Sequence, residues 1–444
     1  MKKNDIFEIE ITGITEDGDG VGRAEGMAVF VPYALLGEKV RVIIVKVLKN
    51  YAAGKLIEVL TPSPYRTKAE CPYFYKCGGC RFWNVSYDAE LEYKRKKVKD
   101  CLLRIGGLDT NVPAVLGAED IREYRNKGQF PVSGDGIGIY AQHSHRVIDI
   151  DGCIIQDKTN PEVLKSIRQW MAEFDVPPYN EETGKGCIRH IYTRQGDSGQ
   201  MVCIVTAGSE LPHQKELISI LRKNVKGITG ILQNINDKRT NVVLGKEFKT
   251  LWGQDFVIDS LGDCQFKLSP LSFYQVNKRQ AEVLYGEARK MAELSGKEVV
   301  WDLYCGTGTI GQFMAKDAKK IVGIEVVPQA VENARENAKL NGIQNTEYYC
   351  GTAEELAPRL RGEKPDVVIL DPPRKGCDER LLHTVAETKA KRIVYISCKP
   401  ATLARDLKIL EGLGYKTQKV VPVDLFPRTS HVECCVLLCH TEPI

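Results

Sequence analysis

A regular alternation of strand-like and helical segments, beginning near residue 278, most restricts the fold of this 444-residue chain. Apolar runs such as EVVWDLY, KIVGIEVV, DVVILD and RIVYISC alternate with amphipathic segments such as KRQAEVLYGEARKMAEL and PATLARDLKILEGLG. Repeated strand–helix–strand units form a parallel, doubly wound sheet, which binds ligands at the carboxyl ends of its strands. We therefore predict a doubly wound α/β domain over residues 266–444, with its site at those strand ends.

A glycine-rich turn follows the first of these strands. Gly306, Gly308 and Gly311 precede the next helix, where glycine lets a ligand approach the backbone at the helix N-terminus. Glu325 ends the following strand, which is the position of an acid that accepts hydrogen bonds from ribose hydroxyls. Both features fit a dinucleotide dehydrogenase and an S-adenosylmethionine enzyme equally well.

The segment Asp371-Pro372-Pro373-Arg374 separates these two alternatives. It directly follows the buried strand DVVILD, where two prolines form a stiff floor beside a ligand. Such a floor is typical of methyltransferases that present a planar group to an activated methyl, although a simple turn is the alternative. The pattern therefore favours S-adenosylmethionine over NAD.

Cys398 is the candidate nucleophile among 15 cysteines. It ends the strand RIVYISC and precedes Lys399 and a helix, and both neighbours are expected to favour the thiolate. Cys377 and Cys305 are rivals, and most cysteines in such a chain are small buried residues. A thiolate that adds to carbon 6 of uracil makes carbon 5 nucleophilic, and a base must then remove the carbon-5 proton.

Glu433 is the candidate for that base. It heads the apolar run ECCVLLC, where burial of a carboxylate is costly unless the group has a partner or a function. A structural ion pair with Arg428 or a neighbouring residue is the alternative.

The rest of the chain predicts two further regions. Residues 6–60 contain four or five short strand-like runs, which predict a small β-barrel, and Pro62 and Pro64 mark its end. Residues 110–265 mix strand-like and helical segments. The first thirty residues lack a secretory signal and no stretch approaches the ~18 apolar residues of a membrane span. We expect a cytoplasmic protein with no membrane partner.

Three cysteines, Cys71, Cys77 and Cys80, lie within ten residues of one another. In a chain without an export signal, such clusters more often bind metal than form disulfides. A closed site needs a fourth ligand, and both zinc and an iron–sulfur cluster remain open. The spacing differs from the C-x3-C-x2-C of radical S-adenosylmethionine enzymes.

The net charge of +4 does not by itself indicate nucleic acid, so any polyanion site must come from local clustering. The densest positive run is Lys94-Arg95-Lys96-Lys97 with Lys99, on a predicted helix. A solvated helix face is the favoured interpretation, with an RNA-facing surface as the alternative. A second, weaker candidate for RNA contacts is the group Arg125, Asn126, Lys127 and Gln129.

Together, four motifs resemble the uridine-5-methyltransferases of bacterial tRNA and 23S rRNA. They are S-C-x-P at 397–400, D-P-P-R at 371–374, H-V-E at 431–433 and S-F-Y-Q-V-N at 272–277. The resemblance implies Cys398 as nucleophile and Glu433 as base. It also implies that Gln275, Tyr304, Glu325 and Asp371 bind S-adenosylmethionine. Lys399 departs from the asparagine that usually follows the nucleophile in this family.

The N-terminal barrel is similar to the TRAM domain of the 23S rRNA branch, an OB-like fold. That branch carries a [4Fe–4S] cluster, and the resemblance assigns its ligands as Cys71, Cys77, Cys80 and Cys153. It further implies a Rossmann-like methyltransferase domain.

We therefore expect three domains: a TRAM-like barrel (1–62), a mixed α/β central domain with the cluster loop (63–265) and the methyltransferase domain (266–444). The expected substrate is 23S rRNA, with tRNA as the alternative, and the expected state is a monomer. A dehydrogenase with an iron–sulfur cluster and a non-catalytic RNA-binding factor are more distant alternatives.

Overall fold

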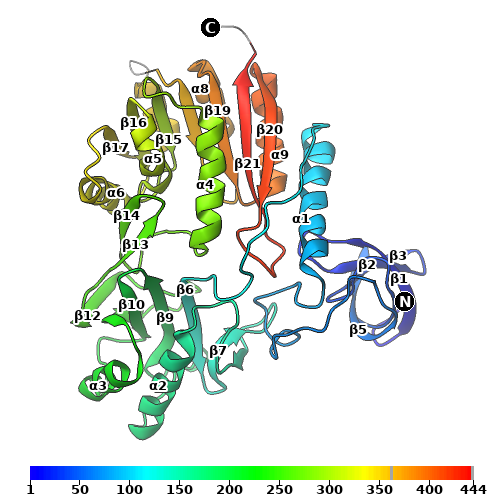
Figure 1. Cartoon of the computed structure of the whole chain (residues 1–444). Coiled ribbons are helices and arrows are strands. Elements are labelled where there is room, and N and C mark those ends of the chain that lie inside the picture. Colours follow the sequence, from blue (N-terminus) through cyan, green and yellow to red (C-terminus); the bar gives the residue numbers. More distant parts are fainter. Residues whose placement is uncertain (361–363, 442–444) are drawn as a thin grey trace.

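The computed structural model describes residues 1–360 and 364–441. It contains an N-terminal barrel, a central α/β layer and a C-terminal α/β layer, with the barrel projecting to one side (Figure 1).

The barrel consists of five strands that close on themselves in the order β1-β2-β3-β5-β4. The strands are β1 (Ile6–Ile14), β2 (Gly20–Ala24), β3 (Met27–Val31), β4 (Lys39–Val47) and β5 (Tyr51–Thr61). Alternate residues such as Ile9, Ile11, Val40 and Val42 fill the interior, as the period of two in a strand requires. The predicted small barrel is confirmed.

The cysteine-rich segment leads into helix α1 (Tyr87–Cys101), which a single π-helical turn (Leu102–Gly106) extends. This helix packs beside α9 (Pro400–Gly412) of the C-terminal layer, where Val98 and Leu102 join its core (Figure 1). The prediction of a solvated basic face is wrong at Lys94, which is 1% exposed. Its ammonium donates to Glu90 and Asp424, each at 2.7 Å, and these two acids compensate its burial.

The central layer is a seven-stranded sheet in the order β12-β11-β10-β9-β6-β7-β8. Its strands are β6 (Lys127–Ser133), β7 (Gly136–Tyr140), β8 (Val147–Asp149), β9 (Ile188–Gly196), β10 (Gly199–Thr206), β11 (Ile228–Ile235) and β12 (Glu247–Gly253). Helices α2 (Asn160–Glu173) and α3 (Gln214–Asn224) cover one face, against Val202 and Ile204. The alternate residues Met201 and Cys203 face the core that continues into the C-terminal layer.

The C-terminal layer is a second seven-stranded sheet in the order β17-β16-β15-β18-β19-β21-β20. Its strands are β15 (Val299–Leu303), β16 (Lys320–Glu325), β17 (Thr346–Cys350), β18 (Val367–Leu370), β19 (Arg392–Ser397), β20 (Tyr415–Val423) and β21 (Glu433–His440). A hairpin of β13 (Val257–Leu261) and β14 (Cys264–Leu268) precedes it. The flanking helices are α4 (Lys278–Ala292), α5 (Thr309–Met314), α6 (Pro328–Leu340), α7 (Ala353–Leu356), α8 (Glu379–Glu387) and α9.

The predicted α/β fold of this layer is confirmed, with two differences. Strand β17 was not predicted, because TEYYC is a short, largely polar run at the sheet edge. Strand β21 runs antiparallel to both β19 and β20, whereas β15 to β19 are parallel. The strand–helix alternation predicted parallel strands, but the described residues 424–432, between β20 and β21, contain no helix, and the antiparallel direction of β21 places Glu433 at the edge where the parallel strands end.

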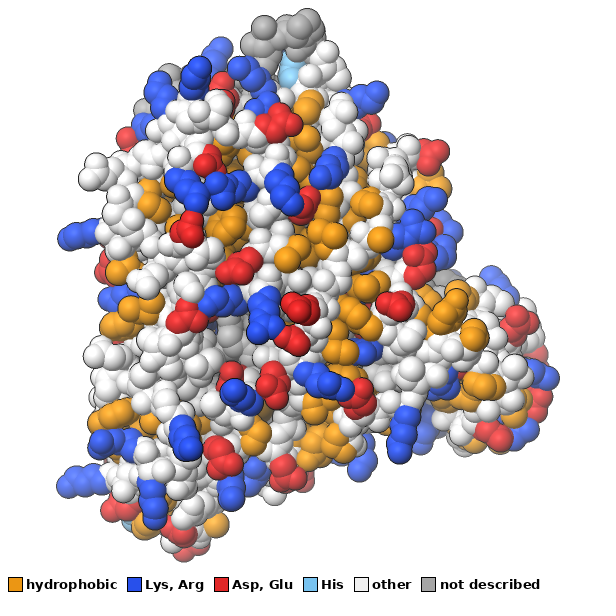
Figure 2. Space-filling model, in the orientation of Figure 1, with side chains coloured by type: hydrophobic (Ala, Val, Ile, Leu, Met, Phe, Trp, Pro, Cys, Tyr) orange, Lys and Arg blue, Asp and Glu red, His pale blue; other side chains and the backbone are white. Residues whose placement is uncertain are grey.

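Within the described part of the chain, no helix is long and apolar enough to cross a membrane. Basic and acidic side chains are interspersed over the visible face, without a large patch of one sign (Figure 2). Any RNA contact on this face must therefore depend on local groups of charges.

Candidate active site

The predicted site residues gather at one edge of the C-terminal sheet. Tyr304 follows β15, Glu325 ends β16, Asp371 follows β18 and Cys398 follows β19. These four strands are neighbours in the sheet and parallel, so their carboxyl ends lie side by side.

Glu433 reaches the same edge from the opposite direction. Ser397 pairs with Cys434 in the antiparallel ladder of β19 and β21, so the next position along each strand places Cys398 opposite Glu433. The Cys398 thiol is partly exposed, whereas Glu433 is 4% exposed. The structure thus brings together the predicted nucleophile and base.

Burial controls the acidity of both groups. It raises the pKa of the Cys398 thiol, and the nearby Glu433 carboxylate raises it further. Burial, with a smaller contribution from the charge of Asp371, raises the pKa of Glu433 to about 8. Burial also raises the pKa of Asp371 to about 7. A carboxyl group with a pKa near neutrality is suited to general acid–base catalysis.

Arg374 is a functional residue whose role the sequence reasoning missed. Its positive charge lowers the pKa of both Cys398 and Glu433. The charges that act most on Cys398 are those of Glu433, Arg374 and Asp371, and Lys399, which was expected to favour the thiolate, is not one of these. The signal for Arg374 was its position in the D-P-P-R motif, three residues after Asp371.

The imidazole of His431 lies against Arg374. The Arg374 Nη2 atom lies 3.3 Å from His431 Nδ1 and 3.2 Å from Nε2. Burial and the charge of Arg374 lower the pKa of His431 to about 4, so its ring is neutral at physiological pH. Because the His431 imidazole is neutral, it does not compensate the positive charge of the Arg374 guanidinium.

The rival nucleophiles are excluded by burial. Cys305 and Cys377 are each 5% exposed. Burial raises the pKa of Cys305 well above its ordinary range and that of Cys377 to about 12. Cys377 also lies 3.5 Å from the Tyr395 hydroxyl, which donates to its sulfur. Neither thiol is accessible to a substrate.

The ion pair of Glu433 with Arg428, which was the structural alternative, does not form. Arg428 instead pairs with Glu90, at 3.4 Å. The charge of Arg374 does lower the pKa of Glu433, so the alternative of an ion pair with a neighbouring residue remains open.

Two acidic side chains accept hydrogen bonds from the backbone amides of the glycine-rich turn. Asp302 Oδ2 accepts a hydrogen bond from Gly311 N at 2.9 Å, and Glu325 Oε2 accepts one from Gly306 N at 3.1 Å. Gly306 has φ +55°, and a β-carbon at this position would meet no atom within 4 Å. The free space above the turn can admit a ligand close to the backbone.

Two of the predicted cofactor ligands have partners of their own. Tyr304 adopts φ +66°, and its hydroxyl donates to Glu354 at 2.9 Å. Gln275 lies next to Tyr285, a buried tyrosine that the sequence reasoning missed. Tyr285 is also within range of the charges of Asp371 and Glu433 and lies beneath the site.

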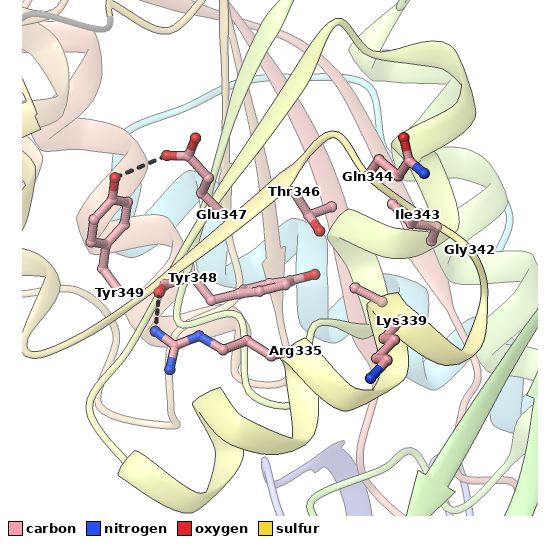
Figure 3. A pocket seen from close by; sticks show the side chains of 10 residues that line it. Arg335, Lys339, Gly342, Ile343, Gln344, Thr346, Glu347, Tyr348 and Tyr349 are labelled. Carbon is pink, nitrogen blue, oxygen red and sulfur yellow. Dashed lines mark hydrogen bonds between the residues drawn. The ribbon is translucent and has the colours of Figure 1, made fainter.

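A groove at the outer edge of the same sheet is separate from this site. Figure 3 shows it lined by the end of α6 and by β17, with Arg335 donating to the Tyr348 carbonyl at 2.7 Å. Three strands, β16, β15 and β18, lie between β17 and β19, and no predicted site residue lines this groove.

The four predicted cluster cysteines lie around one cavity. Cys71, Cys77, Cys80 and Cys153 line a space of about 290 Å³, together with Trp83. Electrostatic interactions connect their thiols: Cys80 interacts with the other three, and burial is the main cause of its raised pKa. Cys153 comes from a segment more than seventy residues further along the chain.

Two observations describe what this cavity can hold. Trp83 Nε1 is buried beside Cys80 without a hydrogen-bond acceptor among the described residues. Across residues 1–360 and 364–441, no three His, Cys, Asp or Glu side chains converge closely enough for a single metal ion. One zinc ion with Zn–S bonds of about 2.3 Å would require sulfurs about 3.8 Å apart.

The second candidate for RNA contacts adjoins this cavity. Arg125, Lys127 and Gln129 line it together with the cysteines. Burial and the charges of Arg194 and Arg125 lower the pKa of Lys127 to about 8. These cations therefore lie beside the thiols.

Comparison with known proteins identifies the family. A family model described as tRNA (Uracil-5-)-methyltransferase matches residues 213–441, and a TRAM domain model matches residues 2–57. An uncharacterized RNA methyltransferase of Clostridium tetani is 47% identical over 446 residues, covering 99% of this chain and 97% of the relative. Another uncharacterized RNA methyltransferase, from Clostridium acetobutylicum, is 48% identical, and the alignment covers 99% of this chain and 98% of the relative.

A solved structure agrees over nearly the whole chain. The crystal structure of Pyrococcus abyssi tRNA (uracil-54, C5)-methyltransferase in complex with S-adenosyl-L-homocysteine superposes with a TM-score of 0.81 at 29% identity. The match covers 97% of this chain and 99% of that one. The chain therefore belongs to the tRNA (uracil-5-)-methyltransferase family and is an S-adenosylmethionine-dependent RNA (uracil-5-)-methyltransferase with an N-terminal TRAM domain.

Proposed function

We propose that the chain methylates uridine through a covalent bond between Cys398 and carbon 6 of the uracil ring. The observation that carries this proposal is the position of a partly exposed thiol opposite a buried carboxylate, with Arg374 acting on both. Nucleophilic catalysis needs such a thiol, and removal of the carbon-5 proton needs such a base.

In the first step the Cys398 sulfur forms a bond to carbon 6, and the ring's electron pair moves to give an enolate with a nucleophilic carbon 5. Arg374 favours this step, because its charge stabilises the thiolate over the thiol. S-adenosylmethionine, when bound, would supply the methyl group for carbon 5, and the bond between that methyl and the sulfonium sulfur would break, leaving S-adenosylhomocysteine.

In the second step Glu433 takes the proton from carbon 5. The electron pair of that carbon–hydrogen bond re-forms the 5,6 double bond, and the carbon–sulfur bond breaks to return the Cys398 thiolate. A raised carboxyl pKa of about 8 gives Glu433 the basicity that proton abstraction requires. Burial also keeps water from competing with the substrate for the carboxylate.

The residues at the other strand ends fit S-adenosylmethionine. Glu325 lies over the open turn at Gly306, where its carboxylate can accept from the ribose hydroxyls. Gln275, Tyr304 and Asp371 complete the proposed binding set around the same edge. The neighbouring Phe273 is 64% exposed, and an exposed aromatic ring can stack on a base that has left its helix.

A trapping experiment tests the covalent mechanism. RNA containing 5-fluorouridine should form an adduct that survives denaturing electrophoresis, because fluorine at carbon 5 cannot be removed as a proton. The Cys398→Ala variant should form none. The Glu433→Gln variant should accumulate a methylated adduct on ordinary uridine RNA. An adduct in the Cys398→Ala variant, or normal release by Glu433→Gln, would contradict the assignment.

We also propose that Cys71, Cys77, Cys80 and Cys153 hold a [4Fe–4S] cluster. Support comes from four thiols around one cavity that lack the close approach a single ion needs. The unpaired Trp83 donor beside Cys80 would find an acceptor in a cluster sulfur. Iron and sulfide analysis of protein purified without oxygen tests this, with the Cys153→Ser variant as the comparison.

For the substrate we propose 23S rRNA, supported by the combination of a TRAM barrel with four such cysteines. A tRNA substrate is the second candidate, because the similar Pyrococcus abyssi enzyme is named for uracil-54 of tRNA. Mapping of 5-methyluridine in both RNAs from a strain lacking this gene separates the two. Loss confined to tRNA would contradict the rRNA proposal.

A further inference from the structure

The catalytic loop, residues 424–432, connects β20 to β21 and leads directly into Glu433. Helix α1 holds its first part. The Lys94 ammonium donates to the Asp424 carboxylate at 2.7 Å and to the Phe426 carbonyl at 3.3 Å. The position of the base therefore depends on a helix that lies outside the sheet carrying it.

The cysteine-rich segment holds the second part of the loop, at Arg428. Directly after Cys80, the amides of Arg81 and Phe82 donate to the Arg428 carbonyl at 2.7 and 3.2 Å. In the reverse direction, Arg428 Nη1 donates to the carbonyls of Phe82 and Val85 at 3.1 and 3.0 Å. Four hydrogen bonds thus join one arginine to the segment that follows the cysteine.

Arg428 itself is in an unusual conformation that these contacts maintain. Its φ is +68°, a left-handed conformation that residues other than glycine rarely adopt. Its amide donates to Glu90 at 2.7 Å, and its guanidinium lies 4.7 Å from the Trp83 ring and 5.4 Å from the Tyr87 ring. The residue is 7% exposed, so no solvent contact replaces a partner that is lost.

Trp83 links this arginine to the cysteine cavity. Its ring lines the cavity and packs with Cys71, Cys80 and Cys153, and the Arg428 guanidinium stacks over the same ring. A continuous set of contacts therefore runs from the four thiols through Trp83 and Arg428 into the catalytic loop.

We propose that Arg428 is a positioning residue that couples the metal-binding cysteine segment to the catalytic base. When the four cysteines hold their group, the segment after Cys80 fixes Arg428, and Arg428 fixes the strand that begins at Glu433. The inference rests on the proposed roles of Glu433 and of the four cysteines. It gives the cysteine site a mechanical function in a methylation reaction that has no redox step.

The kinetic test compares Arg428→Met with the matched Arg189→Met. Arg189 is also buried, donates through Nη1 to two carbonyls at 2.6 and 2.7 Å, and stacks 4.8 Å over Tyr179, but it lies in the central layer. A displacement of about 1 Å at a reacting group can reduce a rate ~100-fold. We expect Arg428→Met to slow release of the methylated adduct at least about tenfold while adduct formation stays within about twofold.

The control outcomes separate positioning from stability. Arg189→Met should leave the ratio between the rate of adduct release and the rate of adduct formation unchanged, even if it lowers the stability of the fold. Arg428→Lys, which keeps the charge and folds more readily, should slow release by an intermediate factor. Equal reductions of both steps in the Arg428 variants, or no reduction of either, would overturn the proposal.

Hydrogen–deuterium exchange without substrate tests the coupling separately from catalysis. Amides of residues 424–432 should exchange faster in Arg428→Met and in Cys80→Ala than in the wild type, and should be unchanged in Arg189→Met. Unchanged exchange in Cys80→Ala would show that the cysteine segment does not hold the loop. If Glu433→Gln releases the methylated RNA at the normal rate, the assignment of Glu433 as the base is refuted. The exchange rates of residues 424–432 then decide whether the cysteine segment is coupled to the loop.

Discussion

Replacing Glu433 by glutamine should stabilise the protein by an amount that grows with pH. Burial raises the pKa of this carboxyl from an ordinary 4.5 to about 8, so the folded protein holds the proton more tightly than the unfolded chain. As pH rises from 4.5 to 8, ionisation therefore favours the unfolded wild type. Glutamine cannot ionise and avoids this destabilisation.

The magnitude follows from the shift in pKa. Each pH unit inside the window changes the free energy of unfolding by about 1.4 kcal/mol, so the stability difference should widen by about 2–3 kcal/mol between pH 5.5 and 7.5. Above pH 8, the ionisation-dependent part of the stability difference between Glu433→Gln and the wild type approaches about 5 kcal/mol. Comparing two pH values removes any constant effect of the amide on packing, because only the ionisation depends on pH.

Urea unfolding followed by tryptophan fluorescence measures this difference, since Trp301 is fully buried in β15 of the same domain. The control is Glu298→Gln. Hydrogen bonds from the amide and hydroxyl of Ser295 help to lower the pKa of Glu298 to about 2 although burial opposes them, so its carboxyl is ionised in both states across this range. Parallel stability curves for Glu433→Gln and the wild type would refute the raised pKa and, with it, the basicity assigned to Glu433.

Other residues give three further expectations. Arg374→Met should raise the pKa of Cys398 and slow its alkylation by iodoacetamide at pH 8; an unchanged rate profile would remove Arg374 from thiolate stabilisation. Glu325→Gln should weaken S-adenosylhomocysteine binding in calorimetry by roughly tenfold, the value of about one charge-assisted hydrogen bond. Lys94→Met should cost about 3–5 kcal/mol by removing the buried cation that Glu90 and Asp424 share, whereas the exposed Lys96→Met should cost about 0–1 kcal/mol in thermal unfolding; similar losses would contradict the buried ion pairs.

Strand-end positions were predictable because they follow from local pattern and connectivity. Tyr304, Glu325, Asp371 and Cys398 each come directly after or at the end of a buried apolar run. Parallel strands joined by helices place all such ends at one edge, whatever the details of packing. The pattern therefore located most of the candidate site before any contact was known.

Residues that depend on direction or on long-range packing were not predictable in this way. Lys94 was interpreted as part of a solvated basic face, although its ammonium is buried against the catalytic loop, where Asp424 neutralises it. Lys399 was expected to favour the thiolate because it adjoins Cys398, but the active charge is Arg374, from the neighbouring strand end. Adjacency along the chain is a poor guide to which charge faces a side chain.

By itself the sequence determined the doubly wound sheet, the barrel and the three clustered cysteines, because these follow from periodicity and spacing within short segments, and the family motifs selected Cys398 as the candidate nucleophile. Only the tertiary structure decided that β21 runs antiparallel and sets Glu433 opposite Cys398, and that Arg428 joins the cysteine segment to the catalytic loop. The first arrangement joins residues on two strands that are not consecutive in the chain, and the second joins segments more than 300 positions apart. Their energies come from hydrogen bonds and burial that exist only once the layers have packed.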